Sequence, residues 1–295
     1  MPGDGVASIV CVVVNWNGWQ DTLACLEALA GQDYARLGVV VVENGSTDDS
    51  AARIRAAYPA ATLVETRKNL GFAAGCNVGI RTAYAQGAEY IWVLNNDTVA
   101  PPDTASKLAA VARATPRAGI IGSVLYYAHD PAQVQAWGGG KVNLWTGFVS
   151  HVTAPASFAG ATTFFTGASV MLPRRVCEEV GILSEAYFMY SDDADLSLRI
   201  HKTGYPLVMA EETAILHKEG ASSPKRSPLI DEYTTISTLR LLERHAPMPV
   251  VSMAIYLALR VGNRALQGRW ANVAAVGRAV GRFRNERGRV FSESL

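Results

Sequence analysis

The sequence predicts an α/β fold with a mostly parallel sheet flanked by helices. In the first half of the chain, short apolar runs alternate with segments of helical periodicity, which is the pattern of a doubly wound parallel sheet. Polar clusters follow three of these runs, at residues 15–18, 43–46 and 95–98. The carboxyl ends of parallel strands meet at one edge of a sheet, where such folds bind ligands. We therefore expect the three clusters to converge there.

The elements of the first half follow in chain order. Four apolar runs are short enough to be buried strands, and they cover residues 8–14, 39–42, 61–65 and 89–94. The first helix is expected to be capped by Asp21 and to place its leucines on one face. The other helices cover residues 50–58, 71–86 and 103–114. Ser46 and Asp49 have a spacing like that of a capping box before residues 50–58.

The second half of the chain has a different pattern. Residues 120–127 and 162–172 are predicted to be strands. Trp137, which precedes three glycines, and residues 143–147 suggest a glycine-aromatic loop or hairpin between them. A helix is expected at residues 192–202, followed by short strands at 207–209 and 214–216, the second of which leads into His217.

Composition narrows the class of protein. With 295 residues and 49% hydrophobic content, the chain can bury a large core, which argues against disorder. A formal net charge of +1 gives no reason to expect nucleic acid as a partner. The four cysteines are widely spaced without a CxxC pair, so we expect reduced, buried thiols. Neither a signal peptide nor a membrane-spanning apolar run is recognised, and the expected location is cytoplasmic.

Charge is distributed unevenly along the chain. Between Arg240 and Arg289 the only acidic residues are Glu243 and Glu286, and nearly every other charge is an arginine. This shift, with a loop-like segment before it, divides the chain into a sheet domain at residues 1–223 and a basic helical region at 224–295. The sheet domain is further divided into halves at about residues 8–115 and 116–223.

Residues 249–283 mix apolar side chains with arginines and are predicted to form one or two amphipathic helices. Such helices can lie in an anionic membrane interface, which would place the protein peripherally on the inner face of a membrane. The alternatives are packing against the rest of the chain, or a homodimer contact, with the arginines solvated.

The apolar run at residues 91–94 ends abruptly in Asn95, Asn96 and Asp97. An oxygen-rich cluster with one full negative charge suits a hard cation that carries a phosphate. The alternative is a strand followed by an Asx turn, without a ligand. The glycine fingerprint of dinucleotide-binding folds and the Walker A lysine are both absent, so a nucleotide would be held in another way.

A second cluster of carboxylates, formed by Asp192, Asp193 and Asp195, lies at the start of a predicted helix. There the three acids complement the helix dipole, which alone would explain them. Crowded carboxylates also raise one another's pKa values, which suits a general base.

These motifs occur together in a fixed order. They are VNWNG at residues 14–18, VENGSTD at 42–48, NLGFA at 69–73, NVG at 77–79, LNNDT at 94–98, TGA at 166–168, FMYSDDADL at 188–196 and the segment 217–222. The set resembles the family 2 glycosyltransferases with the GT-A fold, and it is most similar to their bacterial rhamnosyltransferase-like branch. The resemblance covers residues 8–223.

The resemblance implies a donor site for a nucleoside diphosphate sugar. By branch, the first expectation is dTDP-rhamnose and the second is a UDP-sugar. The acid at the position of Glu43, usually an aspartate, hydrogen-bonds the donor base in this family, and a carboxylate suits a pyrimidine. Asn15 and Asn44 either contact the nucleoside or order the loop. The residues assigned to the donor are Asn15, Glu43, Asn44, Ser46, Asn69, Gly71, Asn77, Asn96 and Asp97.

The resemblance also implies a divalent cation, either Mn²⁺ or Mg²⁺. Residues 95–97 take the place of the family's DXD motif, so Asp97 is expected to bind the ion that holds the donor diphosphate. His217 matches a family histidine that can join this metal. With only one carboxylate in the motif, the donor's own phosphates are expected to complete the site.

The expected chemistry is an inverting transfer to an acceptor hydroxyl during synthesis of a cell-surface polysaccharide or glycolipid. Asp193 aligns with the general base of the family, and Asp192 is the next candidate. The acceptor is expected to be a saccharide or a lipid-linked saccharide. Its region is assigned Trp137, Gly167, Asp195 and Arg199, with Asp195 orienting Arg199 or capping the helix.

Two other functions stay open. A nucleotide-sugar-binding module without catalysis would fit Glu43 and the depleted metal motif, but Asp97, Asp193 and His217 together argue against it. A nucleotidyltransferase on a similar sheet would need a basic, glycine-rich loop near the N-terminus, which this sequence lacks.

Overall fold

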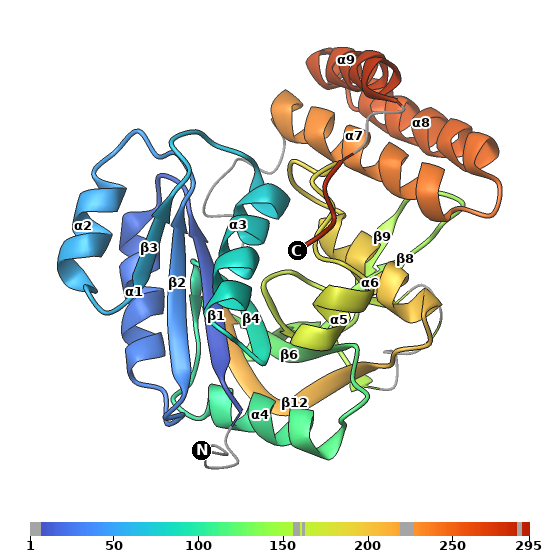
Figure 1. Cartoon of the computed structure of the whole chain (residues 1–295). Helices are drawn as coiled ribbons and strands as arrows, with labels where there is room; N and C mark the ends of the chain where they lie inside the picture. The colour runs from blue at the N-terminus through green and yellow to red at the C-terminus, as the bar shows by residue number, and fades with distance from the viewer. Residues whose placement is uncertain (1–6, 156–159, 161–162, 219–226, 288–290) are drawn as a thin grey trace.

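The computed structural model describes residues 7–155, 160, 163–218, 227–287 and 291–295 (Figure 1). In these residues a nine-stranded sheet runs in the order β3-β2-β1-β4-β11-β6-β12-β5, with β7 paired to β6. A smaller sheet has the order β10-β8-β9. Helices cover the large sheet, and three further helices follow near the C-terminus.

The first half forms the parallel part of the sheet, as predicted. Its strands are β1 (Ile9–Asn15), β2 (Leu37–Glu43), β3 (Thr62–Glu65) and β4 (Tyr90–Asn95). The pairs β1–β2, β1–β4 and β2–β3 are all parallel. Its helices are α1 (Trp19–Ala30), α2 (Ser50–Ala57), α3 (Phe72–Ala85) and α4 (Thr104–Ala114). All four predicted strands and helices are therefore confirmed to within a few residues.

Strand β1 shows why this part of the chain needs unbroken apolar runs. Successive side chains of a strand point to opposite faces of the sheet. Ile9 and Cys11 belong to a buried cluster with residues of α1, α2 and α4, whereas Val10 and Val12 belong to a cluster with residues of α3. Both faces are covered, so each buried aliphatic side chain contributes roughly 1.5–3 kcal/mol.

Two local predictions for the first half are wrong. Gly18 is the N-cap of α1, and Asp21 instead forms an ion pair with Lys218. Asp49 makes no side-chain cap at α2, where the carboxylate of Asp48 accepts the N–H of Ser50 at 3.0 Å. A short strand, β5 (Thr98–Val99), was not predicted.

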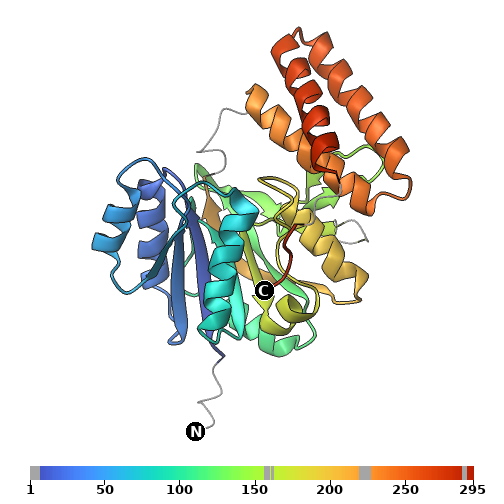
Figure 2. The ribbon, with the colours of Figure 1, turned by 45° about the horizontal axis from the view of Figure 1, so that its top comes forward.

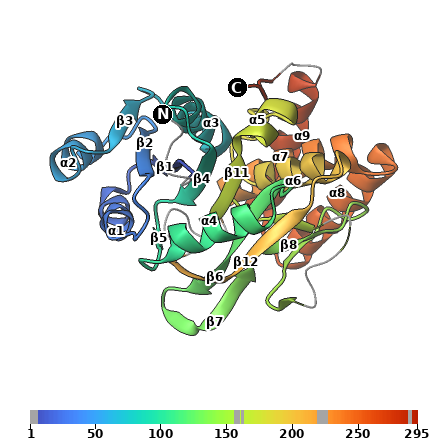
Figure 3. The same cartoon turned by 60° about the horizontal axis from the view of Figure 1, so that its bottom comes forward.

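The second half is a mixed sheet. The described elements are β6 (Ile120–Tyr127), β7 (Asp130–Trp137), β8 (Gly139–Val142), β9 (Val149–His151), β10 (Thr163–Phe165), β11 (Ser169–Pro173), α5 (Arg174–Glu179), α6 (Asp192–Lys202) and β12 (Leu207–His217). The predicted bounds of β6 and α6 are confirmed, and β8 and β9 form the expected hairpin. Figure 3 shows β6 and β12 side by side with β7 at their edge.

Two strand predictions in this half are wrong. Residue 162 lies outside the described residues, and the rest of the predicted strand 162–172 is divided into β10 and β11, which belong to different sheets. The two short strands at 207–216 are one strand, β12, with a register shift between Ala210 and Ile215. There the hydroxyl of Thr213 donates to the carbonyl of Ala210 and accepts the N–H of Val124, so it replaces ladder bonds.

The C-terminal region contains α7 (Pro228–His245), α8 (Pro249–Leu266) and α9 (Trp270–Glu286). Figure 2 shows these helices stacked together above the part of the sheet that carries α6. The prediction of one or two helices over residues 249–283 is confirmed as two, α8 and α9, whereas no separate helix was predicted at α7. Its inner face buries hydroxyls as well as leucines, which weakens the apolar period, and Ser237, for example, donates to the carbonyl of Met189 at 2.8 Å.

The helical region is tied to the sheet domain. Residues 291–295 return along α3 and α5, where the carbonyl of Glu293 accepts the N–H of Ile182 at 2.8 Å and Arg81 bonds to the carbonyl of Ser294. The domain boundary proposed at 223/224 lies outside the described residues and stays a prediction. Among the described helices, none is both long and apolar enough to cross a bilayer. The four cysteines are free and buried, as expected.

Candidate functional site

The ends of β1, β2 and β4 meet at one edge of the sheet. Asn15 is in register with Glu43, and Val14 is in register with Asn95. The side chain of Asn15 connects the neighbouring turns, because its amide donates to the hydroxyl of Ser46 at 3.2 Å and its carbonyl accepts the hydroxyl of Thr22 at 2.7 Å. Thr22 in turn accepts the amide of Asn96 at 3.0 Å. Four polar side chains from separate segments thus form one network at this edge.

Glu43 and Asn44 shape the neighbouring turn. Glu43 is 4% exposed, and its carboxylate accepts the backbone N–H of Ser46 at 2.8 Å. Asn44 is buried, donates to the carbonyl of Gly71 at 3.0 Å and accepts the N–H of Leu70 at 3.1 Å. The contacts of Asn44 correspond to the loop-ordering role that the sequence left open.

The loop around Gly71 is fixed from within the chain. Asn69 accepts the N–H of Gly71 at 2.8 Å, and Gly71 has a φ of +87°. A Cβ at Gly71 would lie 2.4 Å from the carbonyl oxygen of Phe188, so glycine is needed for packing at this position. Asn77 is fully buried and donates to the carbonyl of Leu183 at 2.7 Å. Its side chain ties α3 to that segment, and the assignment of Asn77 to the donor stays a prediction.

Asp97 and His217 lie side by side, although 120 residues separate them in sequence. The antiparallel pairing of β12 with β5 sets His217 opposite Thr98. His217 Nε2 is 3.2 Å from Asp97 Oδ1, and both side chains are nearly buried. His217 Nδ1 is 2.8 Å from Gln135 Oε1, which can only accept, so Nδ1 carries a proton in this contact and Nε2 faces Asp97.

This arrangement fits part of a metal site. Ligand bonds to Mg²⁺ are about 2.0–2.1 Å, so two atoms 3.2 Å apart can bind the same ion. A partner that fixes the tautomer of a histidine is the usual support of a metal ligand. Within the described part of the chain, no group of three His, Cys, Asp or Glu side chains could hold an ion. Further oxygen ligands would have to come from the donor or from solvent.

The acidic cluster begins α6 after a strained turn. Tyr190 and Ser191 both have left-handed φ values, 68° and 62°, which cost free energy in residues other than glycine. Asp193 accepts the N–H of Gly167 at 3.1 Å and of Ala194 at 2.8 Å. The same turn of residues 166–168 accepts the N–H of Asn95 at Ala168, so it connects the ends of β4 and α6.

Asp192 and Asp193 have different environments. Burial raises the pKa of Asp192 well above its usual value, and the charge of Asp193 raises it further. One oxygen of Asp192 has no hydrogen-bond partner among the described residues. Burial also raises the pKa of Asp193, but the N–H groups of Gly167 and Ala194 oppose the shift. Of the two carboxyl groups, Asp192 therefore keeps its proton to a higher pH than Asp193.

Asp193 lines a cavity of about 340 Å³ between the sheet domain and the C-terminal helices. Other parts of its wall are the β8–β9 hairpin, represented by Gly147 and His151, and the helices α7 and α8, represented by Thr238 and Tyr256. Gly167 lies beside Asp193, and its assignment to the acceptor region stays a prediction. Trp137 ends β7 and is not among the residues that line this cavity.

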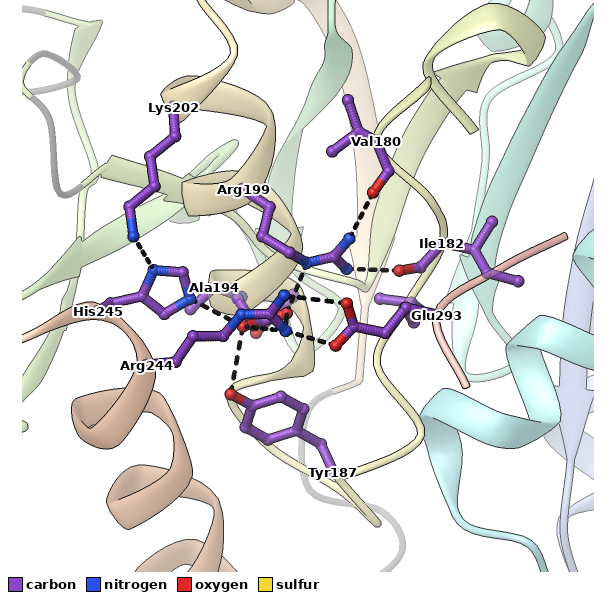
Figure 4. A network of polar contacts seen from close by, with 12 residues as sticks. Val180, Ile182, Tyr187, Ala194, Arg199, Lys202, Arg244, His245 and Glu293 are labelled. Atoms are coloured by element: carbon purple, nitrogen blue, oxygen red, sulfur yellow. Dashed lines mark hydrogen bonds and ion pairs between the residues drawn. The ribbon is translucent and has the colours of Figure 1, made fainter. Parts of the chain in front are cut away.

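Asp195 and Arg199 are not among the residues that line the cavity. Both are buried, and Asp195 Oδ2 accepts Arg199 Nε at 2.8 Å, which is the contact that the sequence suggested. Asp195 Oδ1 accepts His245 Nε2 at 2.8 Å, and Arg244 lies 3.4 Å from the carboxylate. Figure 4 shows Arg199, Arg244 and His245 pointing toward one another between α6 and α7. These contacts are structural, and the assignment of Asp195 and Arg199 to the acceptor region stays a prediction.

The sequence of this fold matches a known family. Residues 10–181 match the model described as Glycosyl transferase family 2. The chain belongs to this family. It is accordingly a glycosyltransferase, and the resemblance noted from the ordered motifs is confirmed.

Two mycobacterial relatives are similar over most of the chain. Galactofuranosyltransferase GlfT1 of Mycobacterium tuberculosis is 25% identical over 225 residues, covering 74% of this chain and 72% of that protein. The N-acetylglucosaminyl-diphospho-decaprenol L-rhamnosyltransferase of the same species is 27% identical over 217 residues, covering 65% of this chain and 69% of that protein.

Solved structures confirm the GT-A type of fold. Mannosyltransferase PcManGT from Pyrobaculum calidifontis, in complex with GDP-Man and Mn²⁺, has a TM-score of 0.59 and 19% identity, covering 97% of this chain and 77% of its own. TarS 1-349 of S. aureus, in complex with UDP-GlcNAc, has a TM-score of 0.59 and 16% identity, covering 94% of this chain and 80% of its own. At these identities the likeness shows the fold alone.

Proposed function

We propose that the protein is an inverting glycosyltransferase with a divalent cation at Asp97 and His217 and with Asp193 as general base. Its donor is a nucleoside diphosphate sugar. Its acceptor is a saccharide or lipid-linked saccharide in the synthesis of a cell-surface polysaccharide or glycolipid. The names of the mycobacterial relatives, a galactofuranosyltransferase and an N-acetylglucosaminyl-diphospho-decaprenol L-rhamnosyltransferase, support a rhamnosyl or galactofuranosyl donor and a lipid-linked acceptor. Our first choice of donor is dTDP-rhamnose and our second is a UDP-sugar.

One observation carries this proposal. A metal-type pair, Asp97 and His217 Nε2, lies at the ligand-binding edge of the sheet, and a turn at residues 166–168 connects that edge to Asp193. The donor and acceptor functions therefore have separate residues that adjoin through one short turn. A binding module without catalysis would not need an ionised carboxylate in a second cavity.

The residues divide the reaction as follows. Asp193 takes the proton of the acceptor hydroxyl, and that oxygen attacks the anomeric carbon from the face opposite the diphosphate. The bond between the anomeric carbon and the phosphate oxygen breaks, and its electron pair leaves with the nucleoside diphosphate, so the configuration inverts. A divalent cation, when bound, neutralises charge on the departing diphosphate.

The experiment is a thermal-shift panel of nucleoside diphosphate sugars, with Mn²⁺ or with a chelator. A ligand that binds only the native state raises stability by about 2.7 kcal/mol at one hundred times its Kd. We expect the largest shift with dTDP-rhamnose or a UDP-sugar, and only with metal.

Gln135→Leu should lower the affinity for Mn²⁺ by about 10–100-fold, because it removes the hydrogen-bond partner of His217. The concentration of Mn²⁺ that gives half of the donor-dependent thermal shift measures this affinity. Gln267→Leu, at an exposed site, is the control.

Other outcomes would change the proposal. Equal thermal shifts with Mn²⁺ and with a chelator would mean that donor binding does not need a metal, and the cation would then be dropped from the proposal. Donor binding with neither transfer nor donor hydrolysis would leave a nucleotide-sugar-binding module.

We also propose peripheral membrane contact through the outer face of α8. The two charges of this helix, Arg260 and Arg264, both turn inward to Asp231, at 2.7 Å each. The outer face carries exposed valines, with Val250 72% and Val251 40% exposed. We expect the chain to sediment with anionic phospholipid vesicles, and the double variant Val250→Ser/Val251→Ser to stay in solution. A wild-type chain that stays in solution at low salt, or forms a dimer that the double variant disrupts, would point to the homodimer instead.

A further inference from the structure

The cavity beside Asp193 has a wall made by α8, a helix outside the segment that matches the family. A Cβ at Gly147, in the β8–β9 turn, would lie 2.6 Å from Thr238 Cγ2 and 2.8 Å from Tyr256 Cδ2. The hairpin therefore packs directly on α7 and α8. The cavity is enclosed by the C-terminal helices as well as by the sheet domain.

Two polar atoms on this wall lack partners among the described residues. They are the hydroxyl of Tyr256 and Nε of Arg260, which lie one helical turn apart on α8. Tyr256 is 2% exposed, and both residues line the cavity with Asp193. A buried donor without a partner costs free energy, so such donors indicate a bound group that supplies an acceptor.

The charge around Arg260 is unbalanced. Asp231 accepts one hydrogen bond from Arg260 at 2.7 Å, another from Arg264 at 2.7 Å and a third from Asn272 at 2.7 Å. A single carboxylate thus neutralises only one of the two guanidinium groups. Burial lowers the pKa of Arg260, which reflects the cost of holding its charge away from water. An anion in the cavity would relieve that cost.

We infer that Tyr256 and Arg260 bind a phosphate or diphosphate group on the acceptor, whose hydroxyl faces Asp193. This inference rests on the proposed function, because it takes the cavity as the acceptor site. A volume of about 340 Å³ holds a small charged group and a sugar rather than a long chain. The class of acceptor is then a glycosyl phosphate or glycosyl diphosphate, and the C-terminal helices select it.

The test uses the full chain with its donor site filled by saturating nucleoside diphosphate and Mn²⁺, so that phosphate binding at the donor site does not contribute. Octyl diphosphate is the probe, octyl glucoside is the neutral comparison, and binding is measured by calorimetry. We expect the diphosphate to bind at least tenfold more tightly than the glucoside.

Three variants distinguish the contribution of the cavity wall to binding from that of the nearby ion pair with Asp231. Tyr256→Phe removes only an unpartnered hydroxyl, so the fold should be unaffected. Arg260→Lys keeps the charge but loses Nε. Each should weaken octyl diphosphate binding by about tenfold. Arg264→Lys, which bonds the same Asp231 but does not line the cavity, should stay within about twofold of wild type.

Equal affinity for the two probes, or unchanged diphosphate binding in Tyr256→Phe and Arg260→Lys, would overturn the inference. The binding of nucleoside diphosphate and Mn²⁺ in the same samples reports on the proposed function. If that binding fails, the proposed function fails. If it succeeds while the probe arms do not differ, only the role of Tyr256 and Arg260 is lost.

Discussion

Asp193→Asn is expected to lower the rate of sugar transfer by about 10³-fold while leaving donor binding intact. General-base catalysis contributes roughly 10²–10⁴-fold to a rate, and an amide cannot take the proton of the acceptor hydroxyl. The side chain keeps its size, and its carbonyl can still accept one of the two backbone N–H groups that Asp193 binds. The measurements are kcat for transfer and the donor-dependent thermal shift.

The pH dependence gives a second measure of the same role. The base must be ionised, and the pKa of Asp193 is raised above its usual value, chiefly by burial. Activity should therefore fall as the pH drops through this raised pKa, at a higher pH than an ordinary aspartate would give. In Asp193→Asn the residual activity should lack this acidic limb.

Asp192→Asn is the matched control. Asp192 keeps its proton to a higher pH than Asp193, so a neutral amide of the same shape should cost less than tenfold in kcat. If Asp192→Asn abolished transfer and Asp193→Asn kept near-normal transfer with an intact donor site, the base would be Asp192.

The sequence predicted the parts of the site that depend on local pattern. Apolar runs ending in polar clusters indicate strand ends, and parallel topology brings those ends together, so Asn15, Glu43 and Asp97 were expected at one edge. The proximity of Asp97 to His217 came from the family resemblance. It depends on the pairing of β5 with β12, which no local pattern shows.

Several residues were missed because their type carries no signal. Gln135 lies in an ordinary edge strand, and only the folded sheet sets it beside His217. Thr22 is one of several polar residues in α1, and it acquires a role through Asn15 and Asn96. Tyr256 resembles a core aromatic of an amphipathic helix, which it also is.

Three other residues of the motifs have contacts within the chain that their sequence context did not show. Asn77, Asp195 and Arg199 are polar residues within motifs that contain functional groups, yet they are buried and bonded to other parts of the chain. In a motif, a polar residue that positions the backbone has the same appearance as one that contacts a ligand. Only burial and hydrogen-bond partners distinguish the two.

Asp195→Asn is expected to lower the free energy of unfolding by about 3–5 kcal/mol, the usual cost of breaking a buried ion pair from one side. Asp195 is fully buried, and it accepts hydrogen bonds from Arg199 and from His245, with Arg244 beside it. An asparagine leaves Arg199 and Arg244 without their counter-charge. Because Asp195 on α6 binds Arg244 and His245 on α7, its loss should weaken the attachment of the C-terminal helices to the sheet domain. Urea unfolding measures the change.

The difference in stability between wild type and Asp195→Asn should be smaller at acidic pH than at neutral pH. Burial raises the pKa of Asp195, but the hydrogen bond from His245 and the charges of Arg199 and Arg244 outweigh it, and the pKa lies below its usual value. A lowered pKa stabilises the fold above the unfolded-state value of about 3.9, and this contribution is lost as the pH falls through the folded-state pKa. Wild type and Asp195→Asn should therefore differ fully at pH 7 and converge in acid.

Asp49→Asn is the matched control, because Asp49 and Arg53 form an ion pair with the same spacing at a helix start but are largely exposed. Exposed pairs of this kind contribute little, so its unfolding curve should match wild type. If Asp195→Asn unfolded in urea like Asp49→Asn, the contacts of Asp195 would not be what holds α7 to the sheet domain. The contacts of residues 291–295 would then have to supply that attachment, and removing those residues would be the variant that separates the helices.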